Sequence, residues 1–415
     1  MPTIPAILDE ALATCKPGVS DLHIVDEVRR FLDILTSRLK KQGSDARVVL
    51  GGSFAKDTWL KGDYDVDVFV AFSMDHAQDD LSGLLAKALK PWNVDRVHGS
   101  RDYFQLKGGI SYEIIPVLDI QKPSDAQNVT DFSPKHVAWV NREGKSLKDD
   151  IRLLKKFCKA QKVYGAESYI RGFSGHVVDI LIIYYGGFVK LLKSAAKTWK
   201  KAPEKTVLDY NNTYKGKALM MLNASKTQGP LVLIDPVQPD RNAAAALTQE
   251  KYDLFVEAAR KFTARPSIEF FREKAVDIWS LKQKGAIIVD LQTLNEKEDV
   301  AGTKMVKLYD KVRVALADNE FTLTDSGWTW DRKKKASFWF KVKEAKLSEK
   351  TIRKGPPAKM KESAAAFKKK YKNTRAVKGR MQAVVPREFR LAKDVIASVL
   401  KSDYAKDKVV SAKLN

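Results

Sequence analysis

The sequence predicts a multidomain α+β protein with a small mixed-sheet head, a helical neck, an α/β body and a basic C-terminal tail. Three observations support this fold class. The chain has 415 residues, more than one ordinary core accommodates. Short β-branched runs mixed with helical periodicity fill the first 120 residues, whereas helical periodicity prevails from residue 146. Most of the net positive charge lies in the last 85 residues. We therefore expect domains over residues 1–145, 146–265, 266–345 and 346–415.

The head (1–145) is predicted to form around a small sheet. Apolar residues from Leu22 to Leu39 recur at helical spacing and Gly43 follows them, so an amphipathic helix is expected near the start of the chain. We also expect a short helix through Trp59 and Leu60 and a longer helix over 81–89. Runs of β-branched and aromatic residues predict strands over 47–50, 64–72, 103–106 and 112–118.

The neck (146–265) is predicted to be helical. Residues 146–149 resemble a capping box that begins a helix through Cys158, and further helices are expected over 174–192 and 249–262. In the body (266–345) the two periodicities alternate again. Here we expect strands over 286–291, 320–323 and 338–342 and a helix near 306–315.

The composition excludes several classes of protein. Hydrophobic residues make up 44% of the chain, so it can bury a sizeable core and global disorder is not expected. Cys15 and Cys158 lie far apart, which argues against a disulfide framework or a zinc knuckle. The longest apolar stretch, residues 177–189, has 13 residues and contains Asp179, too short for a membrane span. We expect a cytoplasmic protein that does not bind a membrane.

The net charge of +23 is concentrated at the C-terminus. Residues 331–415 contain 26 Lys and Arg against 8 Asp and Glu, an excess of +18 that leaves only +5 for residues 1–330. Aromatic residues such as Trp339 and Tyr371 lie among these basic residues, which favours a surface that binds nucleic acid through its phosphates. The alternative is a solvated charged face, in which clusters such as Lys368-Lys369-Lys370 only keep the segment soluble.

The most specific signal is the segment from Gly51 to Lys56 followed by Asp65 and Asp67. Alternate residues of a strand face the same way, so Asp65 and Asp67 project together, and their repulsion favours a bound cation. A pair of Mg²⁺ ions suits carboxylates that serve phosphoryl transfer, and Glu113, within an apolar strand, is the candidate third ligand. The Gly-Gly-Ser turn that opens a short helix is suited to hold a triphosphate.

Each element of this signal has a simpler explanation when taken alone. An Asp-x-Asp strand is often a solvent-facing edge, a Gly-Gly-Ser segment is often only a turn, and a Glu in a strand is usually paired with Lys. Their combination is more specific, because Ser53 precedes Asp65 by 12 residues and a strand with an acidic residue follows.

The stretch GGSFAKDTWLKGDYDVDVFVAF resembles the signature of DNA polymerase β-like nucleotidyltransferases and, within them, the archaeal class I CCA-adding enzymes. The resemblance continues through DFSPKHVAWV, IRLLKKFCKAQKVYGAESYIRGFSGHVVDILIIYYGGFV, LIDPVQPDRNAAAAL and RPSIEFF, and covers residues 20–272. It implies that Asp65, Asp67 and Glu113 are the catalytic metal ligands and that Ser53 and Lys56 bind the triphosphate. It also implies that His136, Lys155 and Tyr164 contact the nucleotide, and that Arg241 and the RNA backbone shape the pocket for C or A.

Alternatives stay open for the residues outside the signature. Lys155 could lie on a solvated helix face, Tyr164 could be a core aromatic, His136 a capping or core residue, and Arg241 a salt-bridge partner of Asp235 or Asp240. Three departures from the family pattern are a Glu at 113 where Asp is usual, a Lys at 56 where Arg is common, and a shortened lysine-rich tail.

The function predicted from this resemblance is addition or repair of the 3′-terminal CCA of tRNA from CTP and ATP, without a nucleic-acid template. The tRNA 3′-hydroxyl is expected to attack the nucleotide α-phosphate in a reaction that requires two Mg²⁺ ions. The rival interpretations are a poly(A) polymerase or an oligoadenylate synthetase relative, and a catalytically silent RNA-binding relative. The tail is expected to bind the tRNA backbone, and the oligomeric state is left open, with a homodimer as one option.

Overall fold

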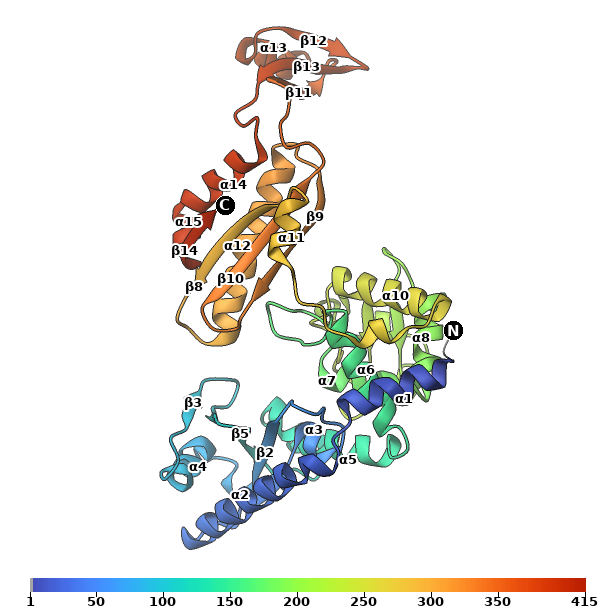
Figure 1. The fold of residues 1–415 in the computed structure, drawn as a ribbon, viewed down its shortest axis with the longest axis vertical. Coiled ribbons are helices and arrows are strands. Elements are labelled where there is room, and N and C mark those ends of the chain that lie inside the picture. Colours follow the sequence, from blue (N-terminus) through green and yellow to red (C-terminus); the bar gives the residue numbers. More distant parts are fainter. Residues whose placement is uncertain (1–2) are drawn as a thin grey trace. The chain divides into compact units, whose positions relative to one another are not determined.

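The computed structural model describes residues 3–415, which form two compact units, one ending at Lys274 and the other spanning Ala275–Asn415 (Figure 1). The first unit holds the predicted head and neck together with residues 266–274, which were predicted to belong to the body. The second unit holds the rest of the predicted body and the tail. The mixed α+β class is confirmed.

The head contains a five-stranded sheet. Only the β2–β5 pair is parallel, and the other neighbours are antiparallel. Val66, Val68 and Val70 alternate along β2 and are fully buried against one face of the sheet, where helices α2 (Leu22–Lys41) and α4 (Leu81–Leu89) pack. The strand order is β1 (Arg47–Leu50), β2 (Asp65–Phe72), β5 (Ser111–Leu118), β4 (Tyr103–Leu106) and β3 (Asp95–Val97).

The predicted helix through Trp59 and Leu60 is wrong. Helix α3 (Gly52–Ala55) ends earlier, because Asp57 adopts a positive φ of 48° that no α-helix continues through. Trp59 is instead buried by stacking on Phe54, with ring centroids 4.6 Å apart. Trp59 and Leu60 are therefore core residues of a connecting segment.

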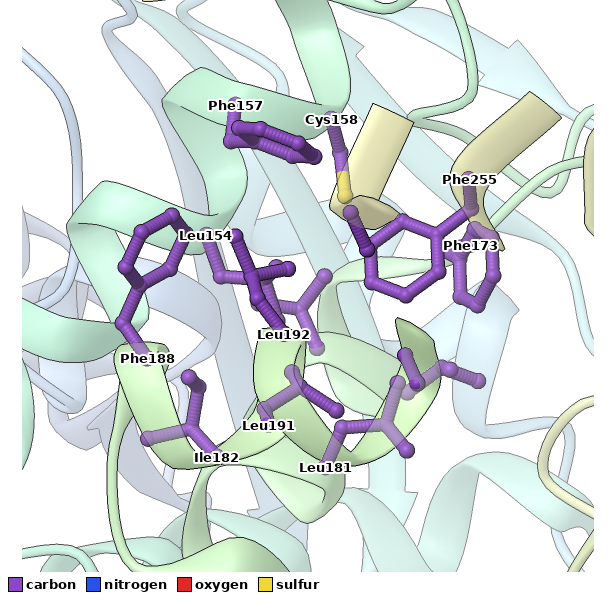
Figure 2. Packing of buried hydrophobic residues seen from close by; sticks show 14 of the residues in the cluster. Leu154, Phe157, Cys158, Phe173, Leu181, Ile182, Phe188, Leu191, Leu192 and Phe255 are labelled. Carbon is purple, nitrogen blue, oxygen red and sulfur yellow. The ribbon is translucent and has the colours of Figure 1, made fainter. Parts of the chain in front are cut away.

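The neck is a helical layer around one aromatic core. Phe157, Phe173, Phe188 and Phe255 converge from different segments and are fully buried (Figure 2). Helices α1 (Ile4–Cys15) and α5 (Ser133–Glu143), predicted to belong to the head, also pack into this core. The other helices and strands of the neck are α6 (Lys148–Ala160), α7 (Gly175–Tyr185), α8 (Phe188–Thr198), β6 (Thr206–Leu208), α9 (Ala218–Met221), β7 (Leu231–Leu233) and α10 (Gln249–Ala264). Strands β6 and β7 pair in parallel.

Two helix predictions in the neck need correction. Residues 146–149 do not form a capping box, because Leu147 is the N-cap residue of α6 and makes no side-chain cap bond. The helix expected over 174–192 is two helices bent by 90°, α7 and α8, because Gly186 and Gly187 have φ of 68° and 132°. Among residues 3–415 no single helix is long and apolar enough to cross a membrane, although this bent pair meets the criteria of length and composition.

The second unit contains two antiparallel sheets. The larger one packs on helix α12, where the ring of Tyr309 lies 5.4 Å from that of Phe338. Its strand order is β14 (Val409–Leu414), β8 (Ile287–Thr293), β10 (Lys335–Val342) and β9 (Leu323–Trp330). The smaller has the order β11 (Lys350–Pro357), β13 (Arg380–Pro386) and β12 (Thr374–Val377). The helices are α11 (Ile278–Gln283), α12 (Glu298–Asp318), α13 (Lys361–Lys370), α14 (Ala392–Lys401) and α15 (Asp403–Lys406).

The second unit differs from the sequence prediction in two places. The strand expected over 320–323 begins only at Leu323, since Glu320 has a φ of 65° in the turn after α12. Residues 346–415 are not a separate tail, because β14 pairs with β8 and completes the body sheet. Strand pairing over such a sequence distance leaves no local signal in the sequence.

Candidate active site

Three carboxylates lie on one face of the head sheet. Asp67 in β2 is the register partner of Glu113 in the parallel strand β5, and Asp65 precedes Asp67 by two residues. Side chains alternate along a strand, so Asp65, Asp67 and Glu113 project from the same face. Asp65 is exposed and the other two are half-buried, while Gln105 Nε2 donates a 2.8 Å hydrogen bond to Glu113 Oε1. The structure therefore brings together the three predicted acidic residues.

The electrostatics of this face suit a divalent cation. Burial and the negative charge of Glu113 raise the pKa of Asp67 to about 6, and Asp65 adds to the effect. The positive charges of Lys56 and Lys155 oppose this shift and lower the pKa of Asp67. Carboxylate oxygens are the ligands that Mg²⁺ prefers, so the donor set fits such an ion.

The Gly-Gly-Ser turn lies directly against Asp67. Gly51 N–H donates a 2.7 Å hydrogen bond to the carbonyl of Asp67. Gly52 has a φ of 53°, and a Cβ atom at this position would overlap Asp67 Oδ2 and lie 2.6 Å from Asp67 Cγ. Glycine is thus required here both by the backbone and by the close approach of the carboxylate. Ser53, which follows in α3, is half-buried at this turn.

Lys56 and Lys155 are held by buried partners from distant parts of the chain. Lys56 Nζ donates to Asp179 Oδ2 of α7 at 2.8 Å, and Asp179 Oδ1 has no hydrogen-bond partner among the described residues. Lys155 Nζ donates to the carbonyl and hydroxyl of Thr58 at 3.0 and 3.1 Å. Lys155 is only 5% exposed, so it does not lie on the solvated helix face considered above.

Burial changes the pKa values of Lys155 and Asp179. Burial lowers the pKa of Lys155 to about 8, although the charge of Asp179 opposes it. Burial alone raises the pKa of Asp179, but the charges of Lys56 and Lys155 outweigh it and hold that pKa below its usual value. Asp179 therefore stays ionised as the hydrogen-bond partner of Lys56 Nζ.

Tyr164 lies between the core and the charged residues. It packs against the neck core, and Lys159 Nζ lies 5.4 Å from the centre of its ring. Its hydroxyl approaches Gly175 at the start of α7, where an added Cβ would lie 3.2 Å away. Burial raises the pKa of Tyr164 above its usual value, so the hydroxyl is neutral. Both the core-aromatic and the nucleotide-contact interpretations are compatible with this placement.

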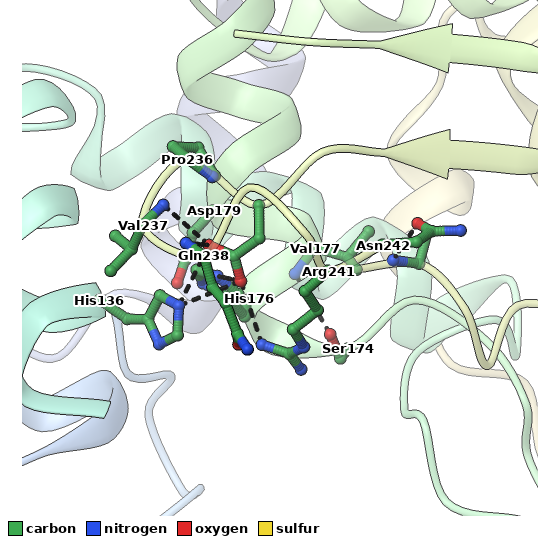
Figure 3. A network of polar contacts seen from close by, with 12 residues as sticks. His136, Ser174, His176, Val177, Asp179, Pro236, Val237, Gln238, Arg241 and Asn242 are labelled. Carbon is green, nitrogen blue, oxygen red and sulfur yellow. Dashed lines mark hydrogen bonds and ion pairs between the residues drawn. The ribbon is translucent and has the colours of Figure 1, made fainter. Parts of the chain in front are cut away.

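His136 and Arg241 meet at one buried carboxylate, Asp235 (Figure 3). His136 Nε2 lies 3.0 Å and Arg241 Nη1 3.1 Å from Asp235 Oδ2. His176 of α7 contacts the same oxygen at 3.2 Å. Arg241 also lines a pocket of about 400 Å³ with Ser174, Lys226, Gln238 and Asn242. The salt bridge to Asp235, considered above as an alternative for Arg241, is present together with this pocket.

Sequence reasoning missed Asp179 and His176 as site residues and treated Asp235 only as a salt-bridge partner. All three lie within or next to apolar runs, where an ionisable residue is unusual and could have been noticed. His176, within one turn of Asp179 on α7, contributes to the low pKa of Asp179, and the charge of Lys56 contributes to the low pKa of His176. The carboxylates, the lysines and the Asp235 cluster therefore form one connected electrostatic site.

Three segments of the chain match models of known protein domains. Residues 28–126 match the model of the nucleotidyltransferase domain, and residues 149–272 match that of the tRNA nucleotidyltransferase second domain. Residues 284–415 match the C-terminal domain of CCA-adding enzymes. The chain is 34% identical to the CCA-adding enzyme of Nanoarchaeum equitans over 338 residues, 80% of this chain and 82% of that one. It is 30% identical to that of Methanocaldococcus jannaschii over 414 residues, 95% and 91% of the two chains.

Solved structures resemble part of this fold. A cytoplasmic RNA terminal U-transferase superposes with a TM-score of 0.51 at 14% identity, over 65% of this chain and 98% of that chain. At this identity the likeness concerns the fold alone.

Proposed function

This chain belongs to the CCA-adding enzyme family and is a CCA tRNA nucleotidyltransferase, and we propose that the carboxylate face and the buried lysines described above are its catalytic site. The observation that carries this proposal is the register of Asp67 with Glu113 beside the Gly52 turn. The proposed substrates are CTP, ATP and tRNA that lacks all or part of its 3′-terminal CCA.

Asp65, Asp67 and Glu113 would hold two Mg²⁺ ions. When bound, these ions would supply the positive charge that favours ionisation of the tRNA 3′-hydroxyl and neutralises the pyrophosphate leaving group. The hydroxyl oxygen forms a bond to the α-phosphorus, and the bond from that phosphorus to the bridging oxygen breaks. The carboxylates orient this end of the nucleotide, and Glu113 is itself oriented by Gln105.

The triphosphate is proposed to bind at Ser53, Lys56, His136, Lys155 and Tyr164. An ammonium group has three N–H donors, and Lys56 uses one of them on Asp179, so two remain for phosphate oxygens. Lys155 donates two hydrogen bonds to Thr58, so one N–H donor remains for a phosphate oxygen. These buried bonds keep both charges in place before the nucleotide arrives, which reduces the reorganisation needed on binding.

Arg241 is proposed to read the nucleobase together with the RNA backbone. Its side chain is 38% exposed while one nitrogen is held by Asp235, so the remaining donors can face the pocket.

The basic second unit is proposed to bind the tRNA backbone. Both cysteines are free and buried, which supports a cytoplasmic location. A homodimer stays a prediction, which light scattering of the purified protein tests.

The decisive experiment incubates the purified chain with Mg²⁺, tRNA lacking its 3′-CCA and each labelled nucleotide separately. We expect CTP alone to add two residues, ATP to add one residue to tRNA ending in CC, and UTP and GTP to add none. Asp65→Ala combined with Asp67→Ala should abolish addition and leave tRNA affinity within about three-fold, since phosphate contacts supply most of that affinity. Asp75→Ala, at an exposed head carboxylate, is the control. Long A tails, or turnover by the double variant, would refute the proposal.

A further inference from the structure

Asp235 is a carboxylate with five donors and no exposed surface. It follows strand β7, within the segment that continues to Arg241. The donors come from three separate elements: His136 of α5, His176 of α7, the Arg241 guanidinium, and the backbone N–H groups of Val237 and Gln238 (Figure 3). A buried charge is tolerated only when it is satisfied in this way, so its neighbours are held in one geometry.

This cluster has the residue types of a metal site but not its electrostatics. One ligand atom from each of His136, His176 and Asp235 lies within 4.8 Å of the others. However, Arg241 Nη1 lies 3.1 Å from Asp235 Oδ2, the oxygen that both imidazoles contact. Asp235 Oδ1 already accepts from Val237 N–H at 3.0 Å and Gln238 N–H at 3.2 Å. A guanidinium at this oxygen repels a metal cation, so the cluster is organised around the carboxylate of Asp235 alone.

We propose that Asp235 is a positioning residue that holds His136 and Arg241 as one unit, so that triphosphate binding and nucleobase selection are coupled. This inference rests on the proposed roles of His136 at the triphosphate and Arg241 at the base. The two side chains come from elements more than 100 residues apart in the sequence, and their shared bond is to one carboxylate oxygen. Displacing either side chain therefore changes the charge and geometry that the other experiences.

Helix α7 extends this coupling to Lys56. His176 and Asp179 lie three residues apart and so share one face of α7. His176 contacts Asp235, which also binds Arg241, while Asp179 contacts Lys56 of the proposed triphosphate site. Burial lowers the pKa of His176, and its Nδ1 has no hydrogen-bond partner in the part of the chain that the structure describes. His176 thus contacts Asp235 from the same turn of α7 that carries Asp179.

Asp235→Asn is the sharpest perturbation of this unit. The amide has nearly the shape of the carboxylate, but it presents an NH₂ group to a site where every neighbour is a donor. Either orientation of the amide faces at least one donor with another donor, and His136 and Arg241 lose the charged acceptor that they share. We expect the KM for CTP and ATP to rise about ten-fold, the effect of losing a charge-assisted hydrogen bond. Discrimination against UTP should fall in parallel.

Asp131→Asn is a matched control. Asp131 is also buried, pairs with Arg101, and accepts from the backbone N–H groups of Leu118 and Asn128 at 2.9 Å. It contacts neither Arg241 nor the lysines of the proposed triphosphate site in any described hydrogen bond. We expect Asp131→Asn to lower the melting temperature while the KM for CTP and the discrimination against UTP stay unchanged.

A double-mutant cycle is a second test of the coupling, and its arm in the wild-type background does not depend on whether Asp235→Asn folds. His136→Ala, Arg241→Ala and the double variant are compared by equilibrium binding of CTP to the full chain. The two effects should deviate from additivity by at least about two-fold, and in the Asp235→Asn background they should add. Additivity in the wild-type background, or an Asp235→Asn protein with unchanged KM and discrimination, would overturn the proposal. Because binding is measured without tRNA, a failure of CCA addition itself is detected separately.

Discussion

Gly52→Ala tests whether the turn before α3 sets the position of the catalytic carboxylate. The structure requires glycine at this position for two separable reasons. The backbone has a φ of 53°, and a Cβ atom would overlap Asp67 Oδ2 and lie 2.6 Å from Asp67 Cγ. Cβ atoms essentially never approach other heavy atoms within 3.0 Å, so the Asp67 side chain or the turn must move.

The expected losses of stability and of turnover follow from the positive φ and from the overlap with Asp67. A non-glycine residue in the left-handed region costs about 1–2 kcal/mol of folding stability. The added methyl also displaces the Asp67 carboxylate by about 1 Å, a misplacement that can reduce the rate about 100-fold when the group orients the reacting atoms. Stability should therefore fall modestly and turnover strongly.

Gly62→Ala separates the two terms. Gly62 has a φ of 83° but no heavy atom lies within 4 Å of the Cβ position, so this variant carries the backbone strain alone. Single-turnover addition of CMP at saturating Mg²⁺ and thermal unfolding are measured for both variants. We expect similar losses of stability and a loss of turnover only in Gly52→Ala. Wild-type turnover in Gly52→Ala, or equal losses of turnover in the two variants, would refute the prediction.

Three further predictions concern the metal, the base and the tRNA. The pKa of Asp67 is raised to about 6, so its contribution to stability without metal is present at low pH and is lost as the pH rises through 6. Mg²⁺ should therefore raise the melting temperature more at pH 7.5 than at pH 5, and Asp67→Asn should remove this difference. Arg241→Ala should disturb the choice of C and A more than binding of tripolyphosphate; unchanged misincorporation and KM would make the residue structural. Changing the exposed Lys368, Lys369 and Lys370 of α13 to Ser should weaken tRNA binding and reduce the salt slope by up to about 2.7, at about 0.9 per phosphate contact. An unaltered affinity and slope would mean that these lysines only maintain solubility.

The sequence alone determined the features that depend on local periodicity. The strands 47–50 and 103–106 and the helix over 81–89 match β1, β4 and α4 residue for residue, because the burial of one face follows the spacing of apolar side chains. The spacing of Asp65 and Asp67 predicted their common face for the same reason. The sequence did not predict the early helix ends at Asp57 and at Gly186-Gly187, because single backbone dihedrals outweigh propensity over a whole helix.

Only the tertiary structure decided which side chains meet. Lys56 and Asp179 are 123 residues apart, and His136 and Asp235 are 99 residues apart. Neither pair belongs to a periodic pattern, so no window of sequence contains both partners. Strand β14 likewise pairs with β8 across the whole second unit. A buried charged side chain requires a partner, and the packing of the whole unit decides which residue lies close enough to pair with it. The residues beside it in the chain do not decide this.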